Sequence, residues 1–286
     1  MKVDRKLFIE KATSLIIKSL LYEVSCYPSP GLVSPVSTGA HNDMDYYTFI
    51  DSISEIGPLF KEIIEMSMSQ IPLNKLLSTI RPIGINIEDA MFTATKKINT
   101  HKGLIFLLGV VVASVSRAFY NNLPFDSVHS VIKEISSNLV KNELCSKKNK
   151  NTITYGEKIF KKYGITGIRG EVEKGLPTVF NHSLPFYEKY SNLKTNQRLY
   201  LTLICIMAHC EDSTLLHRHN IDVLEEVNTR STEILNLMEY KNLKSIEKEV
   251  IKLDKEFSER KISPGGSADL LAVTVFLDGI KDYFPL

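Results

Sequence analysis

Apolar residues recur at helical spacing in nearly every part of this 286-residue chain. The run Phe49, Ile53, Ile56, Phe60 and Ile63 advances in steps of three or four residues, which places these side chains on one face of a helix. The strict alternation that is typical of strands is scarce. The same spacing predicts helices over residues 88–98, 104–120, 127–141, 198–210, 222–238, 239–261 and 267–281.

Composition and charge narrow the class of protein. Hydrophobic residues make up 43% of the chain and charged residues 24%, which excludes a wholly disordered or fibrous chain. Lys and Arg number 35 against 33 Asp and Glu, so no overall field attracts nucleic acid or a membrane. We expect an all-α, single-domain multi-helix bundle over residues 1–286, with glycine-rich loops forming the active site and with no nucleic-acid or membrane partner.

The cysteines and the apolar segments indicate a cytoplasmic protein. Cys26, Cys145, Cys205 and Cys210 show no Cys-x-x-Cys pairing and match no common zinc pattern, so reduced thiols are expected. A lysine within the first apolar stretch disfavours a secretory signal. The longest apolar stretch, residues 104–115, falls short of the roughly 20 residues that cross a bilayer, and we expect it to be a buried core helix.

Glycine and proline mark the expected turns between these helices. They cluster at residues 28–31, 81–84, 164–175 and 263–266. Binding and catalytic residues are often carried by such loops, so chemistry is expected there first. The Lys/Asn-rich run 141–151 and the charged helix 239–261 are expected to be solvated surface.

The first motif, His41–Asp45, lies directly before an expected helix. Asp43 and Asp45 are carboxylates, and Mg²⁺ is held through oxygen by few protein ligands together with waters or phosphate oxygens. The alternative is structural: Asp43 caps the helix and Asp45 lies in its first turn, where the helix dipole favours a negative charge. The residues alone leave both interpretations open.

The second motif, Asn99–Gly103, precedes the most apolar helix. Free backbone N–H groups at a helix start, together with Lys102, suit a phosphate or another anionic oxygen. His101 can move a proton near neutral pH. A helix cap followed by a solvated lysine explains the same residues.

The third motif, Gly164–Glu171, is rich in glycine and continues to Gly175. Glycine lets the backbone approach a ligand closely, and the Arg169 guanidinium can donate two parallel hydrogen bonds to a phosphate. The Lys-Ser pair of a phosphate loop is missing, and no strand followed by a crossover helix is evident, which disfavours a dinucleotide fold. A purely structural glycine turn is the alternative.

The fourth motif, Glu211–Arg218, closes the helix that begins near Arg198. Asp212 can hold a metal or accept a proton, while His217 and Arg218 can face an anion. Cations near the C-terminus of a helix are favourable in any case, so a structural role explains these two residues as well.

The fifth motif, Ser263–Ala272, opens the last expected helix. Gly265 and Gly266 before Ser267 can expose several backbone N–H groups to a phosphate. Ordinary capping by the serine explains the same residues.

Taken in order, these motifs resemble the triphosphoribosyl-dephospho-CoA synthase family. The resemblance runs from about residue 20 to residue 277, and its motifs are highly specific together. The segments that carry it are Tyr22–Ser25, Pro30–Val33, His41–Asp45, Phe49–Ser52, Ile80–Ile85, Ala90–Phe92, Asn99–Gly103, Gly164–Glu171 and Ser263–Ala272.

The resemblance implies a helical enzyme that uses ATP, 3′-dephospho-CoA and a divalent metal, Mg²⁺. The 2′-hydroxyl of dephospho-CoA attacks the ribose carbon that bears adenine, the triphosphate is retained and adenine leaves. Such a reaction needs a base for the hydroxyl, help for the departing adenine and compensation of the triphosphate charge. The product is the prosthetic-group precursor of citrate lyase or malonate decarboxylase, passed to an acyl-carrier-protein holo-synthase, and a homo-oligomer is compatible with this family.

The resemblance also suggests roles for the motif residues. Metal is expected at Asp43, Asp45 and Asp212. Catalytic roles are expected for Asp43, Asp45, His41 and His101. The nucleotide and its phosphates are expected to contact Asn99, Lys102, Arg169, Glu171, His217, Arg218, Gly265, Gly266, Ser267 and Asp269.

The chain departs from the family pattern at several positions. Lys96 and Lys97 stand where the family usually has two glycines, and His219 and Asn220 replace a second such pair. Ser29 stands where lysine is common. These departures leave two alternatives open: a nucleotide-binding accessory protein without turnover, or a metal-dependent nucleoside-type glycoside hydrolase in which water replaces the hydroxyl acceptor.

Overall fold

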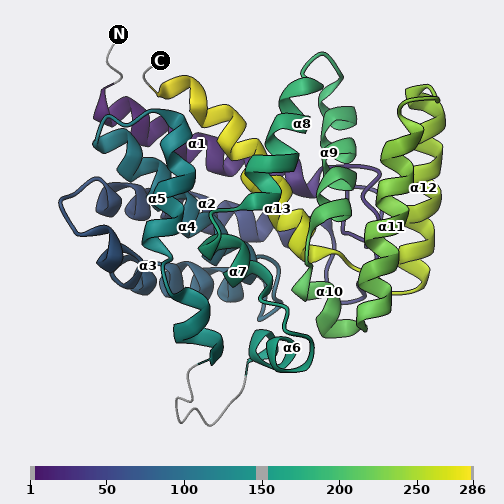
Figure 1. Ribbon diagram of the computed structural model, residues 1–286, viewed down its shortest axis with the longest axis horizontal. Helices are drawn as coiled ribbons and strands as arrows, with labels where there is room; N and C mark the ends of the chain where they lie inside the picture. The colour runs from purple at the N-terminus through teal and green to yellow at the C-terminus, as the bar shows by residue number, and fades with distance from the viewer. Residues whose placement is uncertain (1–3, 146–153, 285–286) are drawn as a thin grey trace.

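The computed structural model describes residues 4–145 and 154–284, and the regular elements in that part of the chain are helices (Figure 1). Within those residues there is no strand, and a single isolated bridge joins Ser34 and Ser37. The all-α prediction is confirmed. The longer helices are α1 Arg5–Val24, α2 Tyr46–Ser67, α3 Leu73–Ala94, α4 Lys102–Tyr120, α9 Thr195–His209, α11 Ile221–Leu237, α12 Leu243–Glu259 and α13 Gly265–Ile280. The shorter ones are η1 Phe125–Ser127, α5 Val128–Ile135, η2 Lys141–Cys145, α6 Tyr155–Tyr163, α7 Gly167–Glu173, η3 Thr178–Ser183, α8 Leu184–Lys189, α10 Ser213–Arg218 and η4 Lys281–Tyr283.

Helix α13 runs through the middle of the molecule and packs against α1, α4, α8, α9 and α10 (Figure 1). It is apolar on almost all sides, and Leu271, Val273, Phe276 and Leu277 have no exposed surface. A helix that is hydrophobic all round can only be stable where other elements surround it. Its first turn, which carries the fifth motif, therefore lies at a junction of several helices.

Helix α4 is long and apolar enough to cross a membrane by length and composition, but 78% of its apolar window is buried inside the protein. It packs against α2, α3, α5 and α13. The expected buried core helix is confirmed.

The expected turn at residues 81–84 is wrong, because α3 continues through Pro82. A proline inside a helix costs about 3 kcal/mol, since it removes one hydrogen bond and crowds the preceding turn. Each buried aliphatic side chain contributes roughly 1.5–3 kcal/mol, so a continuous apolar face outweighs that cost. The buried side chains on either side of the proline are Leu76, Ile80, Ile83, Ile87 and Met91.

Two other boundaries also differ from the expected ones. The helix expected over 127–141 ends at Ile135, and Asn138 then adopts a left-handed conformation with φ 61°, which stops the helix. The loop expected over 164–175 contains α7, whose Val172 is buried against the core. Of the polar run 141–151, residues 141–145 are described and are largely exposed apart from Leu144, while the remainder lies outside the described residues.

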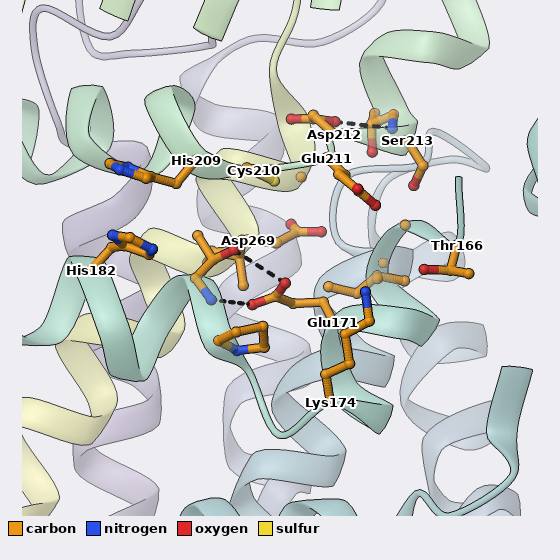
Figure 2. A pocket seen from close by; sticks show the side chains of 18 residues that line it. Thr166, Glu171, Lys174, His182, His209, Cys210, Glu211, Asp212, Ser213 and Asp269 are labelled. Carbon is orange, nitrogen blue, oxygen red and sulfur yellow. Dashed lines mark hydrogen bonds between the residues drawn. The ribbon is translucent and has the colours of Figure 1, made fainter. Parts of the chain in front are cut away.

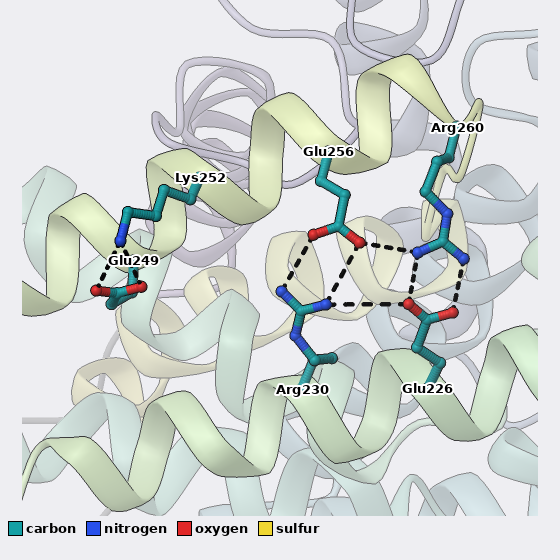
Figure 3. Close-up of polar contacts among 6 residues, drawn as sticks. All are labelled: Glu226, Arg230, Glu249, Lys252, Glu256 and Arg260. Carbon is teal, nitrogen blue, oxygen red and sulfur yellow. Dashed lines mark hydrogen bonds and ion pairs between the residues drawn. The ribbon is translucent and has the colours of Figure 1, made fainter.

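The charged helix expected over 239–261 is confirmed as α12, and ion pairs connect it to α11 (Figure 3). Arg230 donates to Glu256 at 3.1 Å, and Arg260 donates to both Glu226 at 2.7 Å and Glu256 at 2.8 Å. These hydrogen bonds lower the pKa of both carboxyls, so each pair is fully charged at neutral pH. Apolar side chains of α12 face inward beneath this network, including Ile246, Val250, Leu253 and Phe257.

Lys96 and Lys97 keep the backbone of a glycine pair. Their φ angles are 54° and 71°, in the left-handed region that glycine adopts without steric cost. The turn after α3 therefore has a backbone conformation that a pair of glycines would adopt more readily than two lysines. His219 and Asn220 have negative φ, and Asn220 caps α11 by accepting a hydrogen bond from the Val223 backbone N–H at 3.2 Å.

We predict that Arg260→Ala lowers the free energy of unfolding by about 1 kcal/mol, because it removes one corner of a four-residue ion-pair network. The control is Lys252→Ala, which removes an isolated pair with Glu249 in which the lysine side chain is 71% exposed (Figure 3). This variant should change the free energy of unfolding by less than about 0.3 kcal/mol. Urea denaturation measures both. The effect of Arg260→Ala should shrink in about 1 M salt, and an effect that is independent of salt would contradict an ionic origin.

We predict that Lys97→Gly stabilises the protein by about 0.5–1 kcal/mol. Glycine removes the strain of a left-handed residue, and this gain exceeds the cost of the greater conformational entropy that glycine gives to the unfolded chain. Lys61→Gly, at an exposed position inside α2, is the matched control and should cost roughly 1 kcal/mol. Thermal unfolding of the two variants measures the difference. Equal destabilisation by both substitutions would show that the left-handed turn carries no strain.

Candidate functional site

A cavity of about 250 Å³ lies where the N-termini of α10 and α13, the C-terminus of α9 and helix α7 meet (Figure 2). Four of the five motifs contribute to its wall, although they are far apart in the sequence. The predicted site residues and motif glycines in the wall are Gly103, Gly167, Glu171, Asp212, Gly266 and Asp269. A wider hollow of about 940 Å³ lies near the C-terminus, and Lys281 in its wall is paired with Glu188 and Asp278.

The Asp212 carboxylate joins two helix N-termini. Its Oδ1 accepts hydrogen bonds from the backbone N–H groups of Thr214 at 2.9 Å and Leu215 at 3.0 Å, in α10. Its Oδ2 accepts from the Ser267 backbone N–H at 2.9 Å and hydroxyl at 3.2 Å, in α13. Burial raises the pKa of Asp212, and these hydrogen bonds oppose that rise by favouring the charged form. Asp212 thus caps α10 and α13 at once.

This clamp, the Asp212 carboxylate with its donors in α10 and α13, lies at the phosphate cradle expected from Gly265, Gly266 and Ser267. The Asp212 carboxylate lies where the phosphate was expected and occupies the N–H groups at the start of α13. A Cβ on Gly266 would lie 2.9 Å from Asp212 Oδ1, so glycine is needed there for the carboxylate to approach. The glycines of this motif therefore serve contacts within the protein.

Asp269 projects from the second turn of α13 into the cavity. A Cβ on Gly103 would lie 2.8 Å from Asp269 Oδ2, so the start of α4 leaves room for this carboxyl because it carries glycine. Within residues 4–145 and 154–284, no hydrogen bond reaches the Asp269 side chain. Burial raises its pKa well above the usual range, and the nearby carboxyls of Glu23 and Asp212 raise it further. Asp269 consequently holds its proton at a pH where an exposed aspartate is ionised.

Glu23, in the last turn of α1, is the neighbour that contributes most of that electrostatic effect after burial. Its side chain is 8% exposed, and burial raises its pKa to about 8. In the part of the chain that the structure describes, it also has no hydrogen-bond partner. Glu23 is therefore a buried carboxyl and Asp269 a partly exposed carboxyl at the cavity wall, and among the described residues neither has a cation or hydrogen-bond donor that stabilises its charge.

Glu171 is oriented by Thr178 on the other side of the cavity (Figure 2). Its two oxygens accept hydrogen bonds from the Thr178 backbone N–H at 2.7 Å and from the Thr178 hydroxyl at 3.1 Å. Burial raises the pKa of Glu171. Lys174 follows one turn later, and among the described residues that line this cavity it is the only lysine or arginine.

Two histidines stack at the opposite side of the cavity from Thr166 and Lys174 (Figure 2). The rings of His182 and His209 lie 3.8 Å apart between centroids and are inclined by 20°. His209 Nδ1 is 2.8 Å from the Cys205 backbone carbonyl, one turn earlier in α9. Burial lowers the pKa of His182, and His209 lowers it further. The pair thus forms a flat aromatic surface at this end.

His41 belongs to a separate polar cluster outside the cavity wall. Its Nε2 is 2.9 Å from the Ser263 hydroxyl, and its Nδ1 is 3.8 Å from the carboxylate of Asp43, whose side chain is 66% exposed. Burial and the positive charge of Arg218 lower the pKa of His41. The structure therefore brings His41, Asp43 and Arg218 together, but not with Asp269.

Asp45 is the N-cap of α2 and forms a capping box with Thr48, whose backbone N–H donates to it at 2.9 Å. The structural interpretation of this motif holds, with the cap two residues later than expected. Among the predicted metal ligands, Asp43 is exposed and Asp45 caps α2. Asp212 accepts hydrogen bonds from α10 and α13 through both of its oxygens. Residues 4–145 and 154–284 contain no group of three or more His, Cys, Asp or Glu arranged to hold a metal. The expected metal set does not fit.

The second motif points away from the cavity apart from Gly103. His101 is 2% exposed and is 2.7 Å from the Ser52 hydroxyl through Nδ1, and burial lowers its pKa to about 3. This keeps the imidazole neutral at ordinary pH. Asn99 accepts a hydrogen bond from the Lys102 backbone N–H at 3.2 Å, and the Lys102 side chain pairs with Glu88 beside a groove between α3 and α4.

The two remaining expected phosphate ligands have partners elsewhere. Arg169 donates to Glu143 at 2.7 Å. The His217 ring lies 3.6 Å from the ring of Tyr155 between centroids. Neither side chain lines the cavity.

Several cavity residues carry no role in the sequence interpretation. They are Lys174, His182, His209 and Glu211, together with Glu23 behind Asp269. Lys174 and Glu211 adjoin or lie inside recognised motifs, and Glu23 lies within the resembling segment Tyr22–Ser25, so proximity to a motif was a usable signal. His182 lies outside every motif, and only the packing of η3 against α9 and α13 brings it here.

Comparison with known proteins agrees with the family resemblance that the sequence motifs indicate. The family described as CitG, ATP:dephospho-CoA triphosphoribosyl transferase, matches residues 9–286. A probable 2-(5''-triphosphoribosyl)-3'-dephosphocoenzyme-A synthase of Photobacterium profundum is 40% identical over 93% of this chain and 86% of that protein. The 2-(5''-triphosphoribosyl)-3'-dephosphocoenzyme-A synthase of Haemophilus ducreyi is 32% identical over 94% of this chain and 88% of that protein.

A longer relative is also similar. Protein CitXG of Leuconostoc mesenteroides is 38% identical over 91% of this chain, which spans 57% of that protein. No solved structure matches the chain significantly. The match over residues 9–286 and the identities to full-length relatives show that the chain belongs to the ATP:dephospho-CoA triphosphoribosyl transferase family.

Proposed function

We propose that this protein transfers the 5-triphosphoribosyl group of ATP to the 2′-hydroxyl of 3′-dephospho-CoA and releases adenine. The product is the prosthetic-group precursor of citrate lyase or malonate decarboxylase. Family membership over nearly the whole chain supports the reaction. The single structural observation that carries the proposal is convergence: four separate motifs place Gly103, Glu171, Asp212 and Asp269 around one cavity.

The chemistry of the wall suits transfer at a sugar carbon. The 2′-hydroxyl oxygen of dephospho-CoA forms a bond to C1′ of the ATP ribose while the bond from C1′ to N9 of adenine breaks. The hydroxyl loses one proton and the departing adenine gains one, so the step is balanced overall. A transition state of oxocarbenium character is served by one carboxylic acid and one carboxylate of different pKa.

Asp269 and Glu171 are the two carboxyls that we assign to these roles. Asp269 keeps a proton because of burial and neighbouring carboxyls, so it donates to adenine as the glycosidic bond breaks. Glu171, held in place by Thr178, accepts the hydroxyl proton. Lys174 faces the triphosphate, since it is the only lysine or arginine among the described residues of the wall.

Mg²⁺ is proposed to arrive with ATP, bound through phosphate oxygens, because Mg²⁺ needs few protein ligands when a nucleotide supplies oxygens. We further propose that the enzyme works in the cytoplasm, that its product passes to an acyl-carrier-protein holo-synthase, and that a homo-oligomer is the functional form. Mostly buried α4 and the four free thiols of Cys26, Cys145, Cys205 and Cys210 support the cytoplasmic assignment.

The reaction is tested by incubating the protein with ATP, Mg²⁺ and dephospho-CoA and following adenine and the triphosphoribosyl adduct by mass spectrometry. We expect adduct only when both substrates are present. Adenine release without dephospho-CoA would instead indicate the nucleoside-type hydrolase. Bound ATP without adenine release would indicate an accessory protein that lacks turnover.

We predict that Asp269→Asn lowers kcat by about 100-fold or more, because an amide cannot supply the proton that departing adenine requires. Glu211→Gln is the matched control in the same wall and should lower kcat by less than about tenfold. Circular dichroism checks that both variants are folded. Similar rates for Asp269→Asn and the wild type would remove Asp269 from the mechanism.

We predict that Glu23→Gln moves the alkaline limb of the kcat profile to lower pH. Asp269 must be protonated to donate, so activity is present below its pKa and is lost as pH rises through it. Removing the Glu23 charge lowers the pKa of Asp269, because Glu23 and Asp212 are the carboxyls that raise it after burial. Glu10→Gln, at an exposed position on the same helix, should leave the profile unchanged. A limb that stays in place in Glu23→Gln would contradict the coupling.

A further inference from the structure

We infer that Arg218, Lys261 and His41 form the subsite for the diphosphate of 3′-dephospho-CoA, next to the cavity but outside its wall. This inference rests on the proposed function, since it specifies how the acceptor of that reaction is held. The mechanism proposed above gives no role to any of these three residues.

Two substrates that each carry several negative charges must bind at the same time in this reaction. ATP has a triphosphate and dephospho-CoA has a diphosphate, and the two groups repel each other when they lie close together. Lys174 is the only lysine or arginine among the described residues of the cavity wall, and the triphosphate is already assigned to it. The acceptor therefore needs a second cationic site, close enough for its 2′-hydroxyl to enter the cavity.

The cluster of Arg218, Lys261 and His41 lies within that reach. Helix α10 begins in the cavity wall at Ser213 (Figure 2) and ends at Arg218. Five residue steps of an α-helix cover roughly 7.5 Å along its axis. This length is similar to the span between the 2′-hydroxyl and the 5′-diphosphate of one nucleotide. A dephospho-CoA that lies along α10 thus has its reactive hydroxyl in the cavity and its diphosphate beside Arg218, while its pantetheine arm extends beyond the helix.

The proposed base lies at the cavity end of α10. The negative charge of Glu211, two residues before the helix, contributes to the raised pKa of Glu171 after the larger effect of burial, so the two carboxyls lie near each other. A Cβ on Gly167, at the start of α7, would clash with the Ser213 hydroxyl, so α7 and α10 touch here. Glu171 follows one turn later in α7. A hydroxyl at the start of α10 is therefore placed to transfer its proton to Glu171.

The side chains of the cluster produce a positive potential. Burial lowers the pKa of His41 most, and the positive charge of Arg218 lowers it by more than the Asp43 carboxylate raises it. Lys261 lowers it further. Within residues 4–145 and 154–284, the Arg218 guanidinium has no hydrogen bond or ion pair. An anion bound between these groups relieves their mutual repulsion and gives Arg218 a partner.

Contacts between separate loops hold the cluster together. His219, the first residue after α10, has its Nε2 2.9 Å from the Lys261 carbonyl. His41 Nε2 is 2.9 Å from the Ser263 hydroxyl, and the Lys261 ammonium group donates to the Asn42 side-chain oxygen at 3.0 Å. These contacts join the end of α10, the turn before α13 and the loop before α2. The binding groups are thus positioned before the ligand arrives.

The test compares the KM values of the two substrates in variants of the cluster. Arg218→Gln removes the guanidinium charge, so KM for dephospho-CoA should rise about tenfold, while kcat and KM for ATP should change by less than about twofold. Arg218→Lys should raise KM for dephospho-CoA by less than Arg218→Gln does, because a point charge still attracts the diphosphate. Arg5→Gln, at the exposed start of α1 and far from α10 (Figure 1), is the matched control and should leave both KM values unchanged.

Lys261→Gly is a second variant of the cluster. Lys261 has a φ of 58°, which glycine adopts without strain, so this substitution removes the ammonium group and preserves the turn. It should raise KM for dephospho-CoA by about threefold or more. A rise in KM for ATP that equals or exceeds the rise for dephospho-CoA would assign the cluster to the triphosphate and overturn the inference. Unchanged KM values for both substrates in Arg218→Gln would overturn it as well.

Failure of the proposed function is recognised separately. In that case the wild type forms no adduct and releases no adenine. Calorimetric titration of the same proteins with dephospho-CoA then decides the inference by itself. Binding that Arg218→Gln weakens about tenfold and Arg5→Gln leaves unchanged supports the subsite. Binding that Arg218→Gln leaves unchanged, or a wild type that does not bind dephospho-CoA, overturns it.

Discussion

The Asp212 carboxylate is the contact on which the candidate site depends. It accepts four hydrogen bonds, two from the start of α10 and two from Ser267 at the start of α13. Without it, backbone N–H groups at two buried helix ends would be left without partners, which costs roughly 1–3 kcal/mol for each group. The clamp sets the position of α13, and through α13 it sets where Asp269 enters the cavity. A residue predicted to hold metal or move a proton thus serves the site by positioning it.

A second constraint is the concentration of carboxyls around that clamp. Glu23 and Asp212 lie close enough to Asp269 to raise its pKa, and of these three described carboxyls only Asp212 is hydrogen-bonded through both oxygens. Burying unpaired carboxyls is unfavourable, so the protein forgoes stability at this place. The result is a pair of acids whose pKa values lie far above those of exposed carboxyls, which is what protonation of a leaving group requires at neutral pH. The same arrangement would be a defect in a purely structural core.

The helices could be predicted from the sequence because apolar spacing is a local property. The apolar stripe along one side of α12 and the long apolar run of α4 were each sufficient to predict a helix. Pro82 misled the prediction because proline ends helices by local chemistry, whereas here the buried face of α3 compensates for it. Within the candidate site, Glu171, Asp212 and Asp269 were recognised. Lys174 was not, although it lies within the stretch of the third motif that continues to Gly175. His182 and His209 were not either, since nothing local marks a histidine that packing later brings to a cavity.

The sequence by itself determined the all-α class, the family and the motifs that carry polar and glycine residues, because each of these is written in residue order and spacing. Only the tertiary structure decided which motif residues face one another. It separated His41, Asp43 and His101 from the cavity and assigned Asp45 to a helix cap. The physical reason is that the direction of a side chain depends on the helix that carries it and on contacts between distant segments, such as α9, α10 and α13, which spacing along the chain does not encode.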